Sequence, residues 1–418
     1  MPTMTLSEEL TWRGFINQTT FANIQELDRR AWTFYHGFDA SADSQAVGNL
    51  AAMMFDKVFM RHGHKAIILA GGATSLIGDP GGKDSERILQ SEETIAGNVR
   101  SAEVQLKKLF AGYDFTLVNN LDWTKNLRVL DFLRDVGKHF SMTPLVQRDY
   151  IAKRIGEGGA GISYTEFSYT LLQGMDFLHL YDEYAATLQL GGADQWGNCL
   201  SGVDLIRRAR GKEVHVITLP LIINKATGKK FGKSEDGAVW LDPAKTTPTQ
   251  FYQFWITTDD GGVEGYLKIF TELSKPQIDE IMSAHSANPK LRHAQMCLAE
   301  EVTRLVHGEQ ELQIAKGITE MLTGKHTVAE LDPATLAAAR HELGYAHAAP
   351  GTEIAVALVA CGLASSKTEA RRLLADNAIA INGAKTQKEH FEDSDFQNGR
   401  VLIRKGKAYK DSALIERN

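Results

Sequence analysis

Hydrophobic and polar positions alternate in two ways over residues 1–247. Short apolar runs, typical of buried strands, are followed by longer segments in which apolar residues recur at every third or fourth position, as in helices. The runs predict strands within residues 64–74, 113–121, 186–197 and 214–222, and the clearest helical segments span residues 45–63 and 92–110. Strands that alternate with helices predict an α/β fold, a doubly wound parallel sheet whose ligands bind at the carboxyl ends of the strands.

The pattern changes twice along the rest of the chain. Over residues 248–322 the strand signal gives way to helical periodicity, which predicts a small α-helical domain. Residues 323–351 are richer in Ala, Gly, Pro and His, and we interpret them as a linker with one helix at residues 333–344. Residues 352–418 form a third predicted unit, in which eleven Lys and Arg face nine Asp and Glu.

Composition narrows the class of protein. A chain of 418 residues, 43% of them hydrophobic, is long enough for several domains with their own cores. The net charge of −6 argues against a globally basic nucleic-acid binder, although the basic surplus of the last unit suits a local phosphate-bearing partner. Cys199, Cys297 and Cys361 are far apart, so reduced thiols are expected. Neither a targeting leader nor a membrane-spanning run is recognisable, so we expect a cytoplasmic protein with no membrane partner.

Two polar turns follow predicted strands. The stretch "YHGFDASADSQAVGNL", Tyr35 to Leu50, is a candidate strand, loop and helix start with room for a nucleotide at the turn. The stretch "GGATSLIGDPGGKDSER" contains Asp79 and then two cations, Lys83 and Arg87. Glycines allow the backbone to approach a ligand closely, and a carboxylate at such a turn can hold an amino group.

Two further stretches place polar side chains together. In "YTLLQGMDF" Tyr169, Gln173 and Asp176 are spaced by four and three, which puts them on one face of a helix. In "LQLGGADQWG" Asp194 and Gln195 follow paired glycines at a predicted strand end. Each of these residues taken singly also fits a hydrogen-bonded group without a ligand.

A lysine-rich loop, "KKFGKSEDG", offers cations to a phosphate chain. Lys230 and Lys233 flank a phenylalanine-glycine pair, and Ser234 follows. Two ammonium groups on such a loop can offset the charge that develops as pyrophosphate leaves a triphosphate. The same composition also fits a solvated turn.

These stretches together resemble the bacterial tyrosyl-tRNA synthetases, a family of class I aminoacyl-tRNA synthetases. The resemblance covers nearly the whole chain and is carried by "FYHGFDASADS", "GGATSLIGDP", "FLRDVGKHFS", "ISYTEFSYTLLQGMDF", "LQLGGADQWGN", "KKFGKSEDGAVWLDP" and "FYQFWITTDD". It implies a Rossmann-like catalytic domain at residues 1–247, a helical domain at 248–322, and an S4-like α+β RNA-binding domain at 352–418. Family members are homodimers whose interface comes from an inserted segment, here about residues 90–193.

The resemblance also implies a site for L-tyrosine. Tyr35 and Asp176 would hold its phenol between a donor and an acceptor, and phenylalanine would leave that pair desolvated and unpaired. The α-ammonium would lie on Asp79, Tyr169 and Gln173, with Asn120 nearby. Gln195 would lie beside the carboxyl group.

The implied ATP site surrounds that pocket, and Mg²⁺ accompanies the phosphates. Tyrosine's carboxylate would attack the α-phosphorus to give tyrosyl-adenylate, and a ribose hydroxyl of tRNA(Tyr) would then take the tyrosyl group, with positioning and charge supplying the rate. Asp194 would bind the ribose. The groups implied for activating the phosphates are Ser41, Lys83, Arg87, Lys230, Lys233 and Ser234. Other residues implied to contact ATP are His36, Asp39, Gly48, Asn49, Gly192, Phe231 and Gly232.

One signature of the family is altered. Class I synthetases carry a motif, written HIGH, at the start of the helix after the first strand, and here the four positions read "AVGN". Asn49 can still donate a hydrogen bond to a phosphate, whereas Ala46 cannot, and losing one such donor costs about 10² to 10³ in rate. His36 is also unusual, because the family has a small residue there. Its imidazole is either a contact to the nucleotide or a neutral filler of space.

The tail completes the resemblance. Lys367, Arg371 and Arg372 lie largely on one face of a predicted helix, which suits the RNA backbone of tRNA(Tyr), although a solvated face has the same composition. We therefore predict an active tyrosine–tRNA ligase with redistributed phosphate contacts. The alternatives are an RNA-binding paralogue that has lost adenylation, which Ala46 favours, and a tryptophan-specific synthetase, which Tyr35 and Asp176 disfavour.

Overall fold

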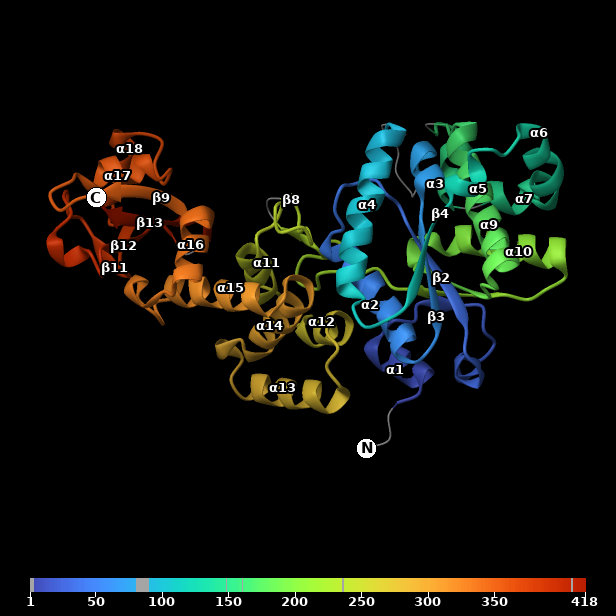
Figure 1. Ribbon diagram of the computed structural model, residues 1–418, viewed down its shortest axis with the longest axis horizontal. Helices are drawn as coiled ribbons and strands as arrows, with labels where there is room; N and C mark the ends of the chain where they lie inside the picture. Colours follow the sequence, from blue (N-terminus) through green and yellow to red (C-terminus); the bar gives the residue numbers. More distant parts are fainter. Residues whose placement is uncertain (1–3, 80–89, 148, 160, 235–236, 407–408) are drawn as a thin grey trace. The chain divides into compact units, whose positions relative to one another are not determined.

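The computed structural model describes residues 4–79, 90–147, 149–159, 161–234, 237–406 and 409–418 (Figure 1). These residues form two compact units, one of residues 1–242 with 259–294 and one of residues 243–258 with 295–418. The chain therefore passes back and forth between the units, and the helices of the predicted domain at 248–322 are divided between them. Helical periodicity identified those helices but did not indicate which core each one joins.

The first unit is built on a six-stranded sheet in the order β1-β6-β5-β2-β3-β4. Its strands are β1 (Gln18–Thr19), β2 (Thr33–Phe38), β3 (Lys65–Ala70), β4 (Phe115–Asn119), β5 (Leu188–Gly192) and β6 (His215–Leu219). Neighbours from β6 to β4 are parallel, and only β1 is antiparallel, to β6. The strand order reverses between β2 and β5, the point at which doubly wound sheets bind ligands.

Helices cover both faces of this sheet, with α2 and α4 on one side and α9 and α10 on the other (Figure 1). Successive side chains of β2 point to opposite faces of the sheet. Tyr35 packs with Phe177 of α9, and Phe34 packs on Phe59 of α2. The helices are α1 (Leu6–Arg13), α2 (Val47–Arg61), α3 (Gly72–Ile77), α4 (Glu92–Leu109), α5 (Leu121–Thr124), α6 (Val129–Asp131), α7 (Met142–Val146), α8 (Asp149–Ile155), α9 (Tyr164–Tyr184), α10 (Trp196–Arg210), α12 (Val263–Phe270) and α13 (Lys275–Ala287). A two-stranded hairpin, β7 (Lys233–Ser234) with β8 (Gly237–Ala238), completes the unit.

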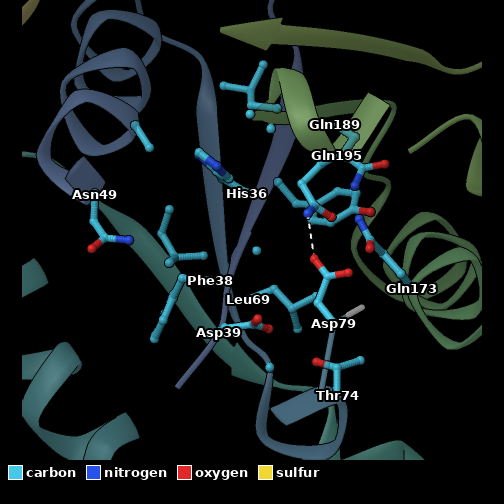
Figure 2. A pocket seen from close by; sticks show the side chains of 18 of the residues that line it. His36, Phe38, Asp39, Asn49, Leu69, Thr74, Asp79, Gln173, Gln189 and Gln195 are labelled. Carbon is cyan, nitrogen blue, oxygen red and sulfur yellow. Dashed lines mark hydrogen bonds between the residues drawn. The ribbon is translucent and has the colours of Figure 1, made fainter. Parts of the chain in front are cut away.

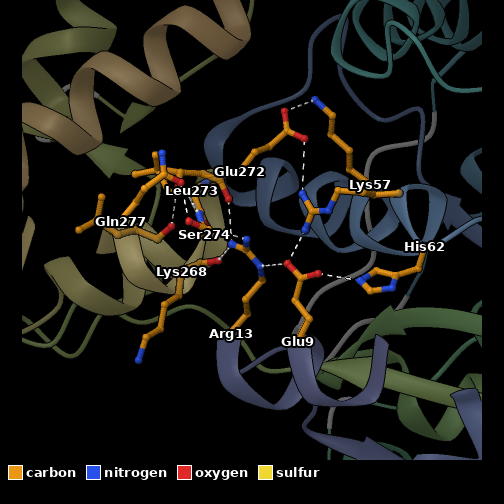
Figure 3. A network of polar contacts seen from close by, with 12 residues as sticks. Glu9, Arg13, Lys57, His62, Lys268, Glu272, Leu273, Ser274 and Gln277 are labelled. Atoms are coloured by element: carbon orange, nitrogen blue, oxygen red, sulfur yellow. Dashed lines mark hydrogen bonds and ion pairs between the residues drawn. The ribbon is translucent and has the colours of Figure 1, made fainter. Parts of the chain in front are cut away.

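A buried arginine holds α12 in this unit (Figure 3). Arg13, at the end of α1, is 3% exposed. Its guanidinium donates to the carbonyl oxygens of Lys268 at 2.6 Å and of Thr271 and Leu273 at 2.9 Å, and to Glu9 Oε1 at 2.6 Å. The carbonyls at a helix C-terminus lack partners within the helix, so a cation that satisfies them anchors the helix end.

Glu9 is the acceptor at the centre of the same network. It also accepts hydrogen bonds from Arg61 and from His62 Nε2, the latter at 2.7 Å. Burial alone would raise the pKa of Glu9, but the hydrogen bonds from His62 and Arg13 lower it to about 2. Glu9 is therefore held as a carboxylate between α1 and α2.

The second unit contains a five-stranded sheet in the order β11-β10-β12-β13-β9. Its strands are β9 (Gly344–Ala348), β10 (Ile379–Ile381), β11 (Ala384–Thr386), β12 (Arg400–Arg404) and β13 (Ser412–Arg417). Its helices are α11 (Pro248–Ile256), α14 (His293–His307), which begins at the boundary, α15 (Glu309–Leu322), α16 (Pro333–Glu342), α17 (Ile354–Ala360) and α18 (Lys367–Ala375).

Both faces of that second sheet are buried. Along β12, Val401 and Ile403 join the core beneath α17 and α18, and Leu402 joins the core beneath α15 and α16. The segment interpreted as a linker carries α16 and also β9, which pairs with β13 in parallel. Within the residues described above, none of the helices combines the length and apolar character that crossing a bilayer requires.

Candidate active site

A cavity of about 360 Å³ opens at the carboxyl ends of β2, β3 and β5, beside the reversal of strand order (Figure 2). The predicted site residues that line it are Tyr35, His36, Asp39, Ser41, Asn49, Asp79, Asn120, Tyr169, Gln173, Asp176, Gly192, Asp194 and Gln195. The structure thus gathers residues from β2, α2, α9 and the turn after β5. Their individual roles stay predictions.

One end of the cavity holds a buried carboxylate and a buried phenol. Asp176 Oδ2 accepts from Asn120 Nδ2 and its Oδ1 accepts from Trp123 Nε1, both at 2.9 Å. The Tyr35 hydroxyl is buried without a hydrogen-bond partner among the described residues. A buried polar group without a partner is costly, so this end suits a ligand that hydrogen-bonds to Tyr35.

Burial raises the pKa values of both groups. It raises the pKa of Asp176 to about 7, against the lowering effect of the bonds from Asn120 and Trp123. Burial, with smaller effects from Cys199 and Asp176, also raises the pKa of Tyr35 well above its usual value. Near neutral pH the phenol therefore keeps its proton.

A second group of polar side chains lies beside this end. Gln195 Nε2 donates to Asp79 Oδ2 at 2.7 Å (Figure 2). The Tyr169 hydroxyl donates to Asp39 Oδ1 at 3.1 Å, and the Gln173 Oε1 atom is buried without a partner in the described part of the chain. Two carboxylates and an amide oxygen that accepts no hydrogen bond from the described residues together suit a cationic donor such as an ammonium group.

Asn120 lines the same cavity and is hydrogen-bonded to two neighbouring elements. Its side chain donates to Asp176 and to Thr74 Oγ1, the latter at 3.2 Å, and accepts from the Ala73 amide at 2.7 Å, while its expected place near the α-ammonium group stays a prediction. Asn120 therefore orients Asp176 at the phenol end.

The N-terminus of α2 forms the opposite end. Ala46 is the N-cap residue and has no side-chain capping bond. Its amide donates to Asn49 Oδ1 at 3.0 Å, and Figure 2 shows the Asn49 amide nitrogen turned toward the cavity. The positive end of the helix dipole attracts anions, so this end is suited to phosphates even without the two histidines.

The lysine-rich loop packs against that helix start. The Val47 amide donates to the Val239 carbonyl at 2.9 Å. Gly232 has a φ of +94°, and a Cβ there would lie 2.9 Å from the Gly48 nitrogen. The Phe231 ring stacks on Tyr266 of α12 with centroids 4.3 Å apart. The loop is therefore anchored on both sides, by glycine contact with α2 and by aromatic stacking on α12.

Several residues of the predicted site are not in the cavity wall. Gly48, in the first turn of α2, and Lys230, Phe231 and Gly232, in the lysine-rich loop, do not line the cavity. Of Lys233 and Ser234 the structure describes the backbone, as β7. Lys83 and Arg87 lie outside the described residues.

His36 forms a pair that the sequence did not reveal. Its Nδ1 lies 2.8 Å from Asp56 Oδ1, and both residues line the cavity. Burial raises the pKa of Asp56, and His36 opposes that rise. The available signal was Asp56 itself, a charge within the apolar run "AAMMFDKVFM". Trp123 was also missed, and its short helix has no periodicity to indicate which way its side chain points.

Comparison with known proteins agrees with this geometry. A family model for class I tRNA synthetases (W and Y) matches residues 27–323, and a model for the tyrosine–tRNA ligase SYY-like C-terminal domain matches residues 340–410. The tyrosine–tRNA ligase of Listeria monocytogenes is 44% identical, over 97% of this chain and 98% of that protein. The chain belongs to the class I tyrosyl-tRNA synthetases. The predicted family and the predicted class I fold are thereby confirmed.

Other members of the tyrosyl-tRNA synthetases give the same result. Tyrosine–tRNA ligase 2 of Bacillus cereus is 43% identical over 99% of this chain and 100% of its own. Among solved structures, a C-terminally truncated Aspergillus nidulans mitochondrial tyrosyl-tRNA synthetase superposes with a TM-score of 0.69 at 31% identity, over 77% of this chain and 94% of that one.

Proposed function

We propose that this chain is a working tyrosine–tRNA ligase, which activates L-tyrosine with ATP and transfers it to the 3′ end of tRNA(Tyr). The observation that carries the proposal is a single cavity that joins a buried phenol-binding pair, Tyr35 and Asp176, to the N-terminus of α2. The near full-length relatives that are themselves named tyrosine–tRNA ligases support it. The match to the C-terminal domain of tyrosine–tRNA ligases disfavours the tryptophan-specific alternative.

Tyrosine is selected at the buried end. The ionised Asp176 accepts a hydrogen bond from the substrate's phenolic O–H, and the Tyr35 hydroxyl, which has no other partner among the described residues, donates to the phenolic oxygen. Phenylalanine would bury the same two groups without a hydrogen bond to either, so the pocket penalises it. Asp79, Tyr169 and Gln173 then receive the α-ammonium, and Gln195 lies beside the carboxyl group.

The first chemical step takes place between the two ends. An oxygen of the tyrosine carboxylate attacks the α-phosphorus of ATP, the bond from that phosphorus to the bridging oxygen breaks, and pyrophosphate leaves. No nucleophile of the enzyme is needed, because positioning and charge stabilisation supply the rate. Mg²⁺ enters as part of the nucleotide substrate, bound to its phosphates.

The remaining groups bind the nucleotide. Asp194 and Gly192 at the end of β5 and Asp39 at the end of β2 lie around the nucleoside. The groups that stabilise the phosphates are Ser41, Asn49, Lys83, Arg87, Lys230, Lys233 and Ser234. Gly48, Phe231 and Gly232 also contact ATP. In the second step a ribose hydroxyl of tRNA attacks the activated carbonyl, and AMP leaves.

The experiment that tests this function changes Ala46, where the family signature has a histidine. We measure tyrosine-dependent exchange of labelled pyrophosphate into ATP by the unaltered protein and by Ala46→His. With redistributed contacts the unaltered protein exchanges, and the new imidazole changes kcat less than the 10²-fold expected for a missing donor. Tyrosine binding without exchange, together with activity that appears in Ala46→His, would refute the proposal in favour of a paralogue that has lost adenylation.

The tail is proposed to bind tRNA. Lys367, Arg371 and Arg372 are all exposed on α18, and the Arg371 guanidinium also pairs with Glu353 at 2.8 Å. Phosphate contacts of this kind release counterions, so binding should weaken steeply with salt. Replacing Lys367 and Arg372 by Gln should lower tRNA affinity and flatten its salt dependence, and unchanged binding would contradict this role.

We also propose a homodimer in the cytoplasm. Large apolar side chains are exposed within residues 90–193, among them Val129 at 73%, Leu130 at 72% and Met142 at 57%. Several large exposed apolar side chains within one segment support an interface with a second copy of the chain. Sedimentation of the unaltered chain should give a dimer, Leu130→Asp should shift it toward monomer, and an unaltered monomer would refute the interface.

A further inference from the structure

The lysine-rich loop begins as a short hairpin. Ile223 and Lys230 form an antiparallel bridge, and the Phe231 amide donates to the Ile222 carbonyl at 2.9 Å. Lys233 follows two residues after Phe231. Because the two arms are hydrogen-bonded to each other, a displacement of the hairpin displaces Lys230 and Lys233 with it.

Tyr266 of α12 touches both arms where this hairpin closes. Its side chain is buried, and its ring stacks on Phe231 of the second arm with centroids 4.3 Å apart and 29° between the ring planes. Its hydroxyl lies 3.5 Å from the carbonyl oxygen of Ile223 in the first arm. One side chain of α12 therefore contacts the hairpin through its ring and through its tip.

Two further contacts fix the Tyr266 ring. Its hydroxyl donates to Asp259 Oδ1 at 2.9 Å. Burial and this bond raise the pKa of Tyr266, so the phenol keeps its proton. The ring also lies directly on Gly262, where a Cβ would be 2.5 Å from Tyr266 Cζ and Oη. Asp259 and Gly262 together therefore leave the ring little freedom to turn away from the hairpin.

The chemistry assigned to the loop needs such an anchor. The ammonium groups of Lys230 and Lys233 act on charge that develops as pyrophosphate leaves, so their position matters in the transition state. Lysine stems are long and flexible, so the backbone that carries them must be placed well. Tyr266 is not among the residues that line the cavity. Its effect on the reaction would therefore pass through the loop.

We propose that Tyr266 is a positioning residue for the lysine-rich loop, oriented by Asp259 and Gly262, and that it holds Lys230 and Lys233 where pyrophosphate leaves. This deepens the proposed function and rests on it for the role of the two lysines. Loss of the ring then lowers kcat, whereas tyrosine affinity stays the same, because Tyr266 does not reach that pocket.

The first test separates kcat from binding. We measure kcat for pyrophosphate exchange, and tyrosine affinity by calorimetry, in the unaltered protein, in Tyr266→Leu and in Tyr266→Phe. Tyr266→Leu should lower kcat by about 10- to 100-fold, the size of effect expected when a positioning contact is lost, and leave tyrosine affinity unchanged. Tyr266→Phe keeps the stacking and should recover most of that rate. An unchanged kcat in Tyr266→Leu would overturn the proposal.

A second variant displaces the ring without removing it. Gly262→Ala puts a Cβ into the space that the Tyr266 ring occupies, so kcat should fall here too. Because both changes act through one contact, the double variant should be no slower than Tyr266→Leu alone, and additive losses would contradict the role of Gly262. Tyr252→Leu is the control, an equally buried tyrosine of the second unit. An equal fall in this control would show a general loss of stability and overturn the proposal.

A third readout needs no turnover. Lys229, Lys230 and Lys233 are trypsin sites, so limited digestion followed by mass spectrometry reports how often the loop opens. Tyr266→Leu should speed cleavage there by about fivefold or more, and Tyr252→Leu should not. Faster cleavage in Tyr266→Leu, when the unaltered protein shows no exchange, would refute the proposed function while supporting the contact. Unchanged cleavage would overturn the contact.

Discussion

Replacing Asp176 by Asn tests the tyrosine pocket most directly. The carboxylate accepts from Asn120 on one oxygen and from Trp123 on the other. An Asn side chain has one acceptor end and one donor end, so in either orientation its NH₂ group faces a donor. The variant therefore loses at least one internal hydrogen bond as well as the charged acceptor for the substrate phenol.

The size of the effect follows from that acceptor. A hydrogen bond to a charged group contributes about 1.5 to 3 kcal/mol, so kcat/KM for tyrosine should fall about 10- to 150-fold. Phenylalanine never uses the acceptor, and its kcat/KM should stay the same or rise. Tyrosine- and phenylalanine-dependent pyrophosphate exchange at saturating ATP measures both. A parallel fall for the two amino acids would indicate damage to the fold and would refute the reasoning.

The pH dependence provides a second readout of the same variant. Because burial raises the pKa of Asp176 to about 7, the free enzyme gains its carboxylate as pH rises through neutrality. The ionised form is the stronger acceptor, so kcat/KM for tyrosine should rise by up to about tenfold between about pH 6 and 8. Asp176→Asn should be flat over that window, and a slope that persists in the variant would assign the titration to another group.

Three further outcomes are expected. Gly232→Ala places a Cβ 2.9 Å from the Gly48 nitrogen at a φ of +94°, so kcat for exchange should fall at least tenfold with little change in tyrosine affinity by calorimetry. Arg13→Met should lower the free energy of unfolding of the first unit by about 3 to 5 kcal/mol in urea, whereas Arg134→Met, in an exposed pair, should leave it almost unchanged. The pKa of Glu9 is about 2 when folded, below its ordinary 4.5, so its contribution is present above about pH 4.5 and is lost as pH falls toward 2. Glu9→Gln should remove that part of the acid dependence of stability, and a tryptophan-fluorescence titration of unfolding checks it.

The site residues whose positions depend on local spacing could be predicted from the sequence. Tyr169, Gln173 and Asp176 could be placed on one helix face because the 3.6-residue period fixes which side chains share a face. Asp194 could be placed at a strand end because paired glycines close an apolar run there. These predictions needed no knowledge of which segments meet in space.

What could not be predicted depends on contacts between distant segments. Nothing in the pattern around His36 indicates that Asp56 is its partner, because that contact arises only when α2 packs on β2. The same holds for α12, whose helical period is clear but whose burial against α1 depends on Arg13. The strand β9 was hidden in a segment of Ala and His, since its partner β13 lies at the far end of the chain.

The division of the first unit along the chain has a consequence for its biosynthesis. Residues 259–294 belong to this unit, and the carbonyls that Arg13 caps are made some 255 residues after it. At about 5 to 20 residues per second, roughly 13 to 50 s pass between the synthesis of Arg13 and the synthesis of these carbonyl groups. During that interval Arg13 and Glu9 of the ribosome-bound chain, which are buried in the folded unit, are exposed to solvent. The surface of α2 that α12 later covers is exposed as well. A chaperone that shields this surface during translation would therefore act before the lysine loop has its aromatic anchor.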